Sequence, residues 1–163
     1  MDVLAAHVGG ILKSHGLMLV TAESCTGGGV AQAITDVAGS SAWFERGFVT
    51  YSNQSKQQML GVTEATLKQH GAVSEATVRE MVAGALANSA AQVALAVSGI
   101  AGPGGGSSDK PVGTVWFAWG VKRGVTLARV HHLVGNRSEI RARAVHIALQ
   151  GVQDLLGQVT KIA

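Results

Sequence analysis

The sequence predicts an α/β fold, a three-layer α/β/α sandwich whose mixed sheet includes one antiparallel hairpin. Two observations predict it. Apolar runs of strand length alternate with segments of helical periodicity along most of the chain. Late in the sequence, two strand-like runs flank Lys122-Arg123-Gly124, which is typical of a hairpin. There are neither repeats nor a linker, and the 163 residues are expected to form a single domain, 1–163, because two would each be small and poorly buried.

In the first half of the chain, helices and strands are expected in turn. Apolar residues at helical spacing predict a helix over residues 3–14 that Gly16 ends. The continuous apolar run 17–21 has strand length, and a helix with one apolar face is expected over 28–37. A strand over 47–52 precedes a short helix that Asn53 could cap and that runs to residue 60.

The second half begins with two helices and ends with one. The helices are expected over 63–70, ended by Gly71, and over about 74–89, and a buried strand follows over 92–97. The strands of the hairpin are expected over 113–121 and 125–133. A last helix begins at Asn136, with Glu139 as its capping-box partner, and continues to about residue 159.

The net positive charge of the chain suggests nucleic-acid binding, but the distribution of the basic residues and the aromatic content do not support this function. The formal net charge is +3, but the basic residues are scattered, and the only dense group is Arg137, Arg141 and Arg143. Aromatic residues make up 4%, too few for a base-stacking platform. A few arginines beside a pocket suit an anionic small molecule equally well. We therefore expect a small-molecule substrate and no nucleic-acid partner.

Cysteine and charge content indicate compartment and assembly. The single cysteine, Cys25, excludes an internal disulfide and fits a reducing cytosol. The amino terminus has no signal-peptide pattern, and no apolar run approaches the ~20 residues that span a bilayer. We therefore expect a cytoplasmic protein without a membrane partner. Charged residues make up only 14%, below the ~25% typical of soluble domains, which favours a homo-oligomer, most simply a dimer.

Three segments at the ends of predicted strands carry the candidate chemistry. They are the turn around Ser24, the stretch 51–56 and the glycine-rich loop 98–106. In an open α/β sheet, ligands bind beyond the carboxyl ends of the strands, so the three segments are expected to share one site. The loop 98–106 either wraps a polar ligand with its free N–H groups or serves only as a connector.

Ser24 stands at a strand-to-helix junction and admits two interpretations. A serine before a glycine-rich helix start is often a plain N-cap. Alternatively, it is a nucleophile whose developing oxyanion is held by N–H groups of the turn. Thr26, Gly27 and Gly28 could instead cradle a phosphate at the helix amino terminus. The segment contains neither the Walker A pattern nor the nucleophile elbow of α/β-hydrolases.

A serine nucleophile needs a base, and histidine is the usual one. None of the six histidines neighbours an expected active-site loop in the sequence. Lysine is the other option, but its pKa of ~10.4 must fall by ~3 units before it serves as a base at pH 7. Lys56 lies shortly after a strand among polar residues and is a candidate for such a pocket. An ordinary exposed lysine on a short helix fits the same pattern.

Tyr51 and Cys25 remain open on local sequence. Tyr51, the only tyrosine, serves either in packing or as a catalytic hydroxyl. Cys25 is either a rival nucleophile, because helix amino termini favour thiolates, or an inert buried residue. No cluster of His, Cys, Asp and Glu has metal-ligand spacing, so no metal site is expected.

Six motifs occur in order along the chain and carry a resemblance to a known family. They are Ala22-Glu23-Ser24-Cys25-Thr26-Gly27-Gly28, Gly39-Ser40-Ser41-Ala42-Trp43-Phe44, Thr50-Tyr51-Ser52-Asn53 with Lys56, His70-Gly71-Ala72-Val73-Ser74, Ser98-Gly99-Ile100-Ala101-Gly102-Pro103 and Lys110-Pro111-Val112-Gly113-Thr114-Val115. Over nearly its whole length, the chain closely resembles the carboxy-terminal domain family of the competence/damage-inducible protein CinA, in its stand-alone form.

The resemblance implies a nicotinamide-nucleotide amidohydrolase, which converts nicotinamide mononucleotide to nicotinate mononucleotide and ammonia in pyridine nucleotide salvage. By motif match, it implies Ser24 as nucleophile, Lys56 as base and Tyr51 as a proton-relay or orienting group. The serine–lysine chemistry of the family implies neither a metal nor a cofactor. The 5′-phosphate needs a cationic or N–H-rich seat, for which the candidates are Thr26, Gly27, Gly28, Gly99, Ala101, Gly102, Arg137 and Arg141.

A second hypothesis comes from a different class of function. The family name suggests a non-catalytic nucleotide- or protein-binding module that acts in competence or DNA-damage responses. A pocket can persist after activity is lost, so the two hypotheses predict the same fold. The presence of Ser24, Tyr51 and Lys56 favours the amidohydrolase.

Overall fold

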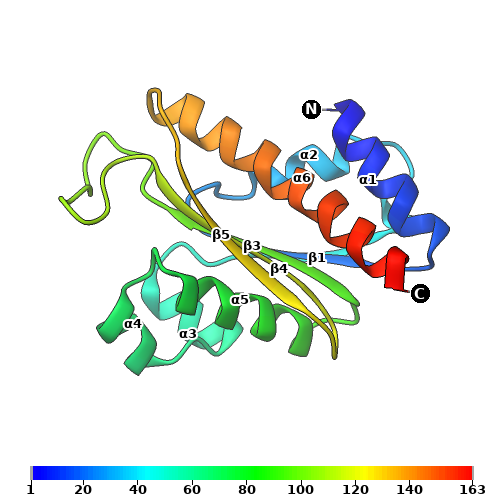
Figure 1. The fold of residues 1–163 in the computed structure, drawn as a ribbon, viewed down its shortest axis with the longest axis horizontal. Helices are drawn as coiled ribbons and strands as arrows, with labels where there is room; N and C mark the ends of the chain where they lie inside the picture. The colour runs from blue at the N-terminus through cyan, green and yellow to red at the C-terminus, as the bar shows by residue number, and fades with distance from the viewer. Residues whose placement is uncertain (1, 163) are drawn as a thin grey trace.

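The computed structural model describes residues 2–162, with side chains over 3–158, and arranges them in three layers (Figure 1). A five-stranded sheet forms the middle layer. One face is covered by helices α1 (Asp2–Ser14), α2 (Gly29–Thr35) and α6 (Arg137–Ile162). The other face is covered by α3 (Asn53–Leu60), α4 (Glu64–His70) and α5 (Glu75–Ala87). The predicted α/β sandwich is confirmed.

The strand order brings the ends of three parallel strands to one edge of the sheet. The order is β2-β1-β3-β4-β5, built from β1 (Leu19–Glu23), β2 (Phe44–Val49), β3 (Val93–Gly99), β4 (Thr114–Val121) and β5 (Thr126–His132). β1 is parallel to β2 and β3, β4 is antiparallel to β3, and β4 and β5 form the predicted hairpin. The segments that follow β1, β2 and β3 therefore meet, as the sequence predicts.

The central strand β3 is buried on both faces. Val93, Leu95 and Val97 pack in the core beneath α1, α2 and α6, and Ala94 and Ala96 pack in a second core beneath α5. This double burial explains why the strand reads as a continuous apolar run without alternation. The loops at its end are therefore attached to a closely packed base.

The second strand lies earlier in the chain than the predicted 47–52. It spans Phe44–Val49, because the chain leaves the sheet at the next two residues. The backbone carbonyl groups of Thr50 and Tyr51 accept hydrogen bonds from the side-chain ammonium of Lys56. The end of this strand is therefore set by a buried lysine that local alternation does not reveal.

Helix α3 is capped by Ser52, and the predicted cap, Asn53, is its first helical residue. The hydroxyl of Ser52 accepts a hydrogen bond from the N–H of Ser55 at 3.0 Å. In return, the hydroxyl of Ser55 accepts one from the N–H of Ser52 at 3.1 Å. This reciprocal pair satisfies two N–H groups of the first turn and holds the start of the helix that carries Lys56.

The predicted capping box at the last helix is confirmed. The N–H of Asn136 donates to Oε1 of Glu139 at 3.0 Å, and the N–H of Glu139 donates to Oδ1 of Asn136 at 2.9 Å. The bounds of the predicted helices and strands all lie within three residues of the observed ones; β2 is shifted by three residues at both ends, and α6 extends to Ile162 instead of 159. Among the described helices, none combines the length and the apolar character needed to cross a membrane.

Helices α3 and α5 approach until backbone meets backbone, at Gly84. A Cβ atom added to Gly84 would lie 1.8 Å from the carbonyl oxygen of Leu60, far inside any allowed contact. Leu60 is the last residue of α3. The absence of a side chain at Gly84 therefore fixes the position of the helix that carries Lys56.

The substitution Gly84→Ala is expected to lower the free energy of unfolding by about 1–3 kcal/mol or more, because the added methyl group overpacks this contact. Gly10→Ala in α1 is the matched control. Nothing lies within 4 Å of a Cβ atom at Gly10, so this change should be neutral or stabilise by up to about 1 kcal/mol through helix propensity. Urea unfolding measures the free energy of unfolding of both variants. Equal changes in the two would contradict the claim that Gly84 lies in close contact with the backbone of Leu60.

Candidate active site

Ser24 follows β1 directly and does not cap α2. The N-cap of α2 is Gly28, which has no side-chain cap. The N–H of Ser24 donates to the carbonyl of Val97 in β3 at 3.0 Å, and the carbonyl of Ser24 accepts from the N–H of Gly27 at 3.0 Å. Gly27 and Gly28 have φ values of 58° and 100°, a left-handed conformation that favours glycine. The N-cap interpretation of Ser24 is therefore wrong.

The side chain of Lys56 is buried against Ser24. Lys56 is 1% exposed, and its Nζ lies 3.0 Å from the Oγ of Ser24. Nζ also donates to the carbonyl oxygens of Thr50, at 2.8 Å, and Tyr51, at 3.4 Å. Among the described residues, no carboxylate forms an ion pair with Lys56. The exposed-lysine interpretation is therefore wrong.

Burial without a counter-ion lowers the pKa of Lys56 from its usual 10.5 to about 8. The main cause is the removal of the ammonium from water, which penalises its charged form. At pH 7 about a tenth of such a lysine is neutral, against about 0.04% of a free lysine. A neutral amine at hydrogen-bond distance from a hydroxyl can act as a general base toward it.

Cys25 lies beside this pair as a protonated thiol. It is 6% exposed, and burial raises its pKa to about 11. A thiol with such a pKa holds almost no thiolate at neutral pH, and the thiolate is the reactive form. The environment therefore favours the inert-residue interpretation of Cys25 over the nucleophile interpretation.

Ser24 and Lys56 open onto a cavity of about 240 Å³. It is lined by Ser24, Cys25, Tyr51, Asn53, Lys56, Ala72, Val73, Ser98, Gly99, Ala101 and Arg137. These residues come from the ends of β1, β2 and β3, from the start of α3 and α6, and from the segment between α4 and α5. The three segments that the sequence singled out therefore meet in one cavity.

Some of the predicted ligand residues lie at this cavity. Gly99, Ala101 and Arg137 line it, and the carbonyl of Gly102 accepts a hydrogen bond from Nη1 of Arg137 at 2.6 Å. Four further lining residues were not predicted as site residues: Asn53 and Ser98, which lie in the candidate segments 51–56 and 98–106, and Ala72 and Val73, which lie outside them. All four stand inside the quoted motifs, but without the fold nothing in their types set them apart.

Tyr51 lies at the mouth of the cavity and does not contact the Ser24 hydroxyl. Its side chain is 62% exposed, and its hydroxyl accepts a hydrogen bond from Nη2 of Arg137 at 3.1 Å. Only its backbone carbonyl reaches Lys56. The geometry therefore fits an orienting group at the mouth better than a proton relay between Ser24 and Lys56.

The amino terminus of α2 is occupied by the side chain of Glu23 and is no phosphate seat. The buried carboxylate accepts hydrogen bonds from the hydroxyl of Thr26 at 2.6 Å and from the N–H groups of Val30 and Ala31 at 2.9 and 3.1 Å. Negative charge at a helix amino terminus is favourable, and here the protein supplies it. The proposed cradle of Thr26, Gly27 and Gly28 is therefore corrected, since none of the three lines the cavity.

Arg141, the second arginine predicted to seat the phosphate, also lies elsewhere. Its Nε donates to the carbonyl of Cys25 at 3.0 Å and its Nη2 to the carbonyl of Thr26 at 3.1 Å. It lines a separate hollow between α2 and α6, which shares no lining residue with the Ser24 cavity. Arg141 therefore holds the turn that carries Ser24 and does not face the cavity.

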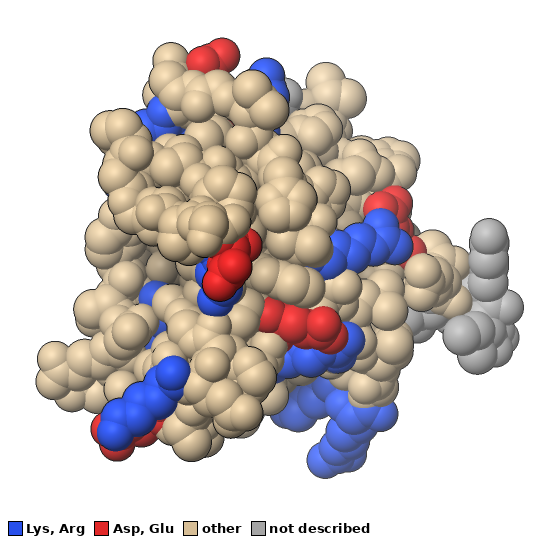
Figure 2. Space-filling view, turned by 60° about the vertical axis from the view of Figure 1, so that its left-hand side comes forward, with Lys and Arg blue, Asp and Glu red and all other residues tan. Residues whose placement is uncertain are grey.

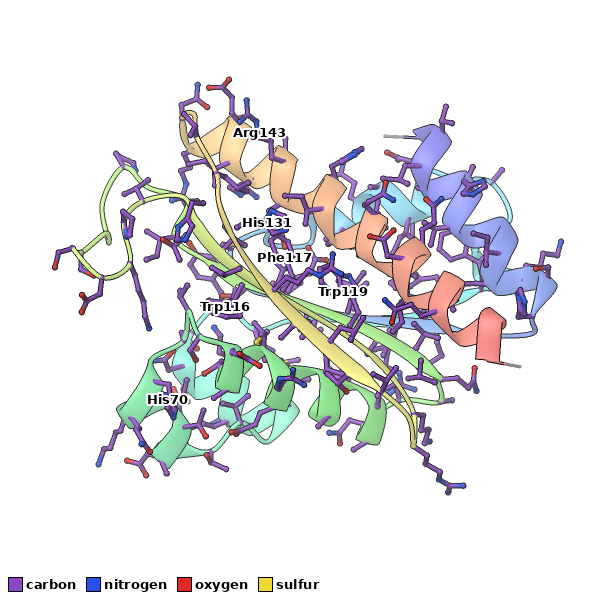
Figure 3. The ribbon with its side chains drawn as sticks, in the orientation of Figure 1. His70, Trp116, Phe117, Trp119, His131 and Arg143 are labelled. Carbon is purple, nitrogen blue, oxygen red and sulfur yellow. The ribbon has the colours of Figure 1, made fainter. Side chains whose placement is uncertain are left out.

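Neither a metal-binding cluster in the described part of the chain nor a continuous basic stripe on the face drawn in Figure 2 is found. Within it, no three His, Cys, Asp or Glu side chains come together in a way that could hold a metal ion. His70 lies at the end of α4, and His131 packs edge-on against Phe117 at 5.5 Å (Figure 3); neither histidine lines the Ser24 cavity. On the face drawn in Figure 2, Lys and Arg stand in separate groups, several beside acidic side chains, with no continuous basic stripe.

Comparison with known proteins identifies a matching family. The sequence model described as the CinA C-terminal domain matches residues 1–156. The chain is 58% identical over 147 residues to the nicotinamide-nucleotide amidohydrolase PncC of Escherichia coli K12, covering 90% of this chain and 89% of that protein. It is 53% identical over 155 residues to the protein of the same name from Pseudomonas putida, covering 95% and 96%.

Solved structures share the fold at similar identity. The competence/damage-inducible protein CihA from Agrobacterium tumefaciens has a TM-score of 0.92 and 48% identity, with 94% of each chain covered. The competence damage-inducible protein A from Klebsiella pneumoniae has a TM-score of 0.92 and 44% identity, with 96% of each chain covered. The similarity therefore extends over the whole sheet and both helical layers.

The substitution Glu23→Gln is expected to lower the free energy of unfolding by about 1–3 kcal/mol, because an amide NH₂ would face the N–H of Val30 or Ala31 and leave a buried donor unsatisfied. Glu64→Gln is the control, since Glu64 is exposed and pairs only with Lys68 at 3.5 Å, a contact worth at most about 0.5 kcal/mol. Chemical denaturation measures both. If Glu23→Gln lowered the free energy of unfolding no more than Glu64→Gln does, this would contradict the claim that the carboxylate of Glu23 stabilises the start of α2.

Proposed function

The chain belongs to the CinA C-terminal domain family, and we propose that, as a nicotinamide-nucleotide amidohydrolase, it converts nicotinamide mononucleotide to nicotinate mononucleotide and ammonia with Ser24 as nucleophile and Lys56 as base. One observation carries this proposal: the Nζ of Lys56 lies 3.0 Å from the Oγ of Ser24, and both residues line the same cavity. The names of the relatives from Escherichia coli and Pseudomonas putida support the substrate.

The first half of the reaction forms an ester on Ser24. Neutral Lys56 accepts the hydroxyl proton as Oγ attacks the carboxamide carbon, and the carbonyl oxygen becomes an oxyanion held by N–H groups of the turn. The resulting ammonium remains hydrogen-bonded to the carbonyls of Thr50 and Tyr51. It then gives a proton to the leaving nitrogen, so that the C–N bond breaks and ammonia departs.

The second half releases the acid. Lys56, neutral again after the first half, accepts a proton from a water molecule that attacks the ester carbon. The ester bond to Ser24 breaks, and the proton returns to its Oγ, which restores the free hydroxyl. The serine and the lysine supply nucleophile, base and acid between them, so the mechanism requires no metal or cofactor, and the activity should be insensitive to chelators.

The size of the cavity supports a binding mode in which the aromatic ring of the substrate lies inside it and the phosphate lies at its mouth. Its volume of about 240 Å³ is below the ~300–1,000 Å³ of pockets that enclose a drug-sized ligand, but it is large enough for an aromatic ring. Ala72, Val73 and Ala101 offer the ring apolar surface. We assign the phosphate to Arg137 at the mouth, where Tyr51 orients the guanidinium through a hydrogen bond of 3.1 Å.

The remaining expectations form part of the same proposal. A nucleotide substrate fits a cytoplasmic enzyme of pyridine nucleotide salvage that has no nucleic-acid partner. The low content of charged side chains, 14%, continues to favour a homo-oligomer, most simply a dimer. Sedimentation velocity would give the oligomeric state directly.

Substitution of the nucleophile tests the mechanism. Ser24→Ala is expected to lower ammonia release from nicotinamide mononucleotide by roughly 10⁴- to 10⁶-fold, as for other serine nucleophiles. Cys25→Ala in the same cavity should retain most of the activity, because the thiol takes no part in the reaction. Undiminished turnover by Ser24→Ala would contradict the serine mechanism. Loss of activity in a folded Cys25→Ala variant would favour Cys25 as the nucleophile. A wild-type chain that binds the nucleotide without releasing ammonia would be the non-catalytic binding module.

The pH dependence tests the base. Below its pKa Lys56 is protonated and cannot accept the serine proton, so kcat/KM should rise about tenfold per pH unit at acidic pH and level off above about 8. Steady-state kinetics from about pH 6 to about pH 9.5 measure this limb. A profile that is flat from about pH 6 upward, or that rises only near pH 10, would contradict the role of Lys56.

A further inference from the structure

Arg141 is the only charged side chain that donates to the backbone of the Ser24 turn among the described residues. It reaches the turn from α6, across 116 residues of sequence, with Nε on the carbonyl of Cys25 and Nη2 on the carbonyl of Thr26. The planar guanidinium fits two adjacent carbonyl groups at once, which a lysine cannot do. Both carbonyls therefore point toward α6.

The direction of these carbonyls fixes the direction of one N–H group. The carbonyl of Cys25 and the N–H of Thr26 belong to the same planar, trans peptide unit, so they point in opposite directions. With its carbonyl on Arg141, this unit turns the N–H of Thr26 away from α6. The unit begins at Cys25, which lines the Ser24 cavity, and ends at Thr26, which together with Arg141 lines the separate hollow between α2 and α6.

The N–H of Thr26 is also left without an acceptor in the described part of the chain. Two neighbouring N–H groups of the turn are engaged. The N–H of Ser24 donates to the carbonyl of Val97, and the N–H of Gly27 donates to the carbonyl of Ser24. The N–H of Thr26 therefore stands two residues from the nucleophile with a free hydrogen, in a peptide unit that begins at the cavity-lining Cys25.

The side chain of Thr26 is held in place as well as its backbone. Its hydroxyl donates to the buried carboxylate of Glu23 at 2.6 Å, and its side chain is 1% exposed. Glu23 fixes the side chain and Arg141 fixes the carbonyl groups on both sides of the residue. The peptide unit is therefore held in one orientation before any substrate binds, as preorganised oxyanion donors are.

We infer that Arg141 is a positioning residue for the hydrolysis, which orients the peptide unit of Cys25 and Thr26 so that the N–H of Thr26 donates to the carbonyl oxygen of the substrate as it becomes an oxyanion. This inference rests on the proposed function and assigns Arg141 a role in the chemical step. The interaction strengthens as negative charge develops on the oxygen, so it acts on kcat more than on substrate binding.

The alternative is that Arg141 binds the phosphate, and the two roles predict different kinetics. The substitution Arg141→Met is expected to lower kcat by about 10- to 100-fold, somewhat less than the loss of a whole oxyanion donor, with KM changed by less than about threefold. Arg141→Lys keeps the charge but not the paired hydrogen bonds, so it should lose a similar factor. Arg143→Met is the control, because Arg143 is exposed on the same helix (Figure 3) and should leave kcat unchanged.

Two further readouts separate this role from a merely structural one. In a Ser24→Ala background, Arg141→Met should leave the Kd for nicotinamide mononucleotide, measured by calorimetry, unchanged. With the thiocarboxamide analogue of the substrate, sulfur accepts hydrogen bonds only weakly, so the rate ratio of oxygen to sulfur substrate should fall at least about fivefold in Arg141→Met. General loosening of the fold would lower both rates and leave their ratio unchanged.

Each outcome decides between these accounts. A kcat within twofold of wild type in both Arg141 variants, or an unchanged oxygen-to-sulfur ratio, overturns the inference. A KM and a Kd that both rise at least tenfold while kcat holds assign Arg141 to the phosphate. If thermal melting shows that Arg141→Met does not fold, Arg141→Lys decides by the same criteria. A wild-type chain that releases no ammonia overturns the proposed function, and this inference with it.

Discussion

The burial of one lysine against one serine is the interaction on which the site depends. Lys56 has no carboxylate partner among the described residues, and its ammonium is held only by a hydroxyl and two backbone carbonyls. Such an arrangement disfavours the charged form, so the fold keeps at its centre a group that would be more stable in water. The same cost gives the lysine the neutral fraction near neutral pH that its proposed role as base requires.

The rest of the fold supports this contact from both faces of the sheet. On one face, the backbone contact between Gly84 and Leu60 and the cap formed by Ser52 hold the helix that brings Lys56 inward. On the other face, Glu23 and Arg141 hold the turn that carries Ser24. The parallel strands β1, β2 and β3 place the helix that carries Lys56 and the turn that carries Ser24 at the same edge of the sheet (Figure 1). The site is therefore supported by residues that do not themselves line the cavity.

The sequence predicted the layers because apolar periodicity is a local property, and it predicted the meeting of the three segments because ligands bind beyond the carboxyl ends of strands in an open α/β sheet. It also identified the pair of Ser24 and Lys56, although local pattern alone left the serine open to a capping role. It failed where a side chain binds backbone carbonyl groups. The end of β2 depends on hydrogen bonds from Lys56 to the carbonyls of Thr50 and Tyr51, which local alternation does not reveal. The contacts of Arg141 reach carbonyl groups 116 and 115 residues away, and no local pattern encodes them.

The titration of Lys56 itself tests the central claim most directly. In a chain labelled at lysine with ¹³C and ¹⁵N, the side-chain resonance of Lys56, assigned by its absence from the spectrum of Lys56→Met, can be followed against pH. The account predicts a midpoint of about 8, well below that of the other lysines. A midpoint near the ordinary value of ~10.4 would show that the ammonium is solvated and charged at neutral pH, and would contradict the role of Lys56 as the base for Ser24.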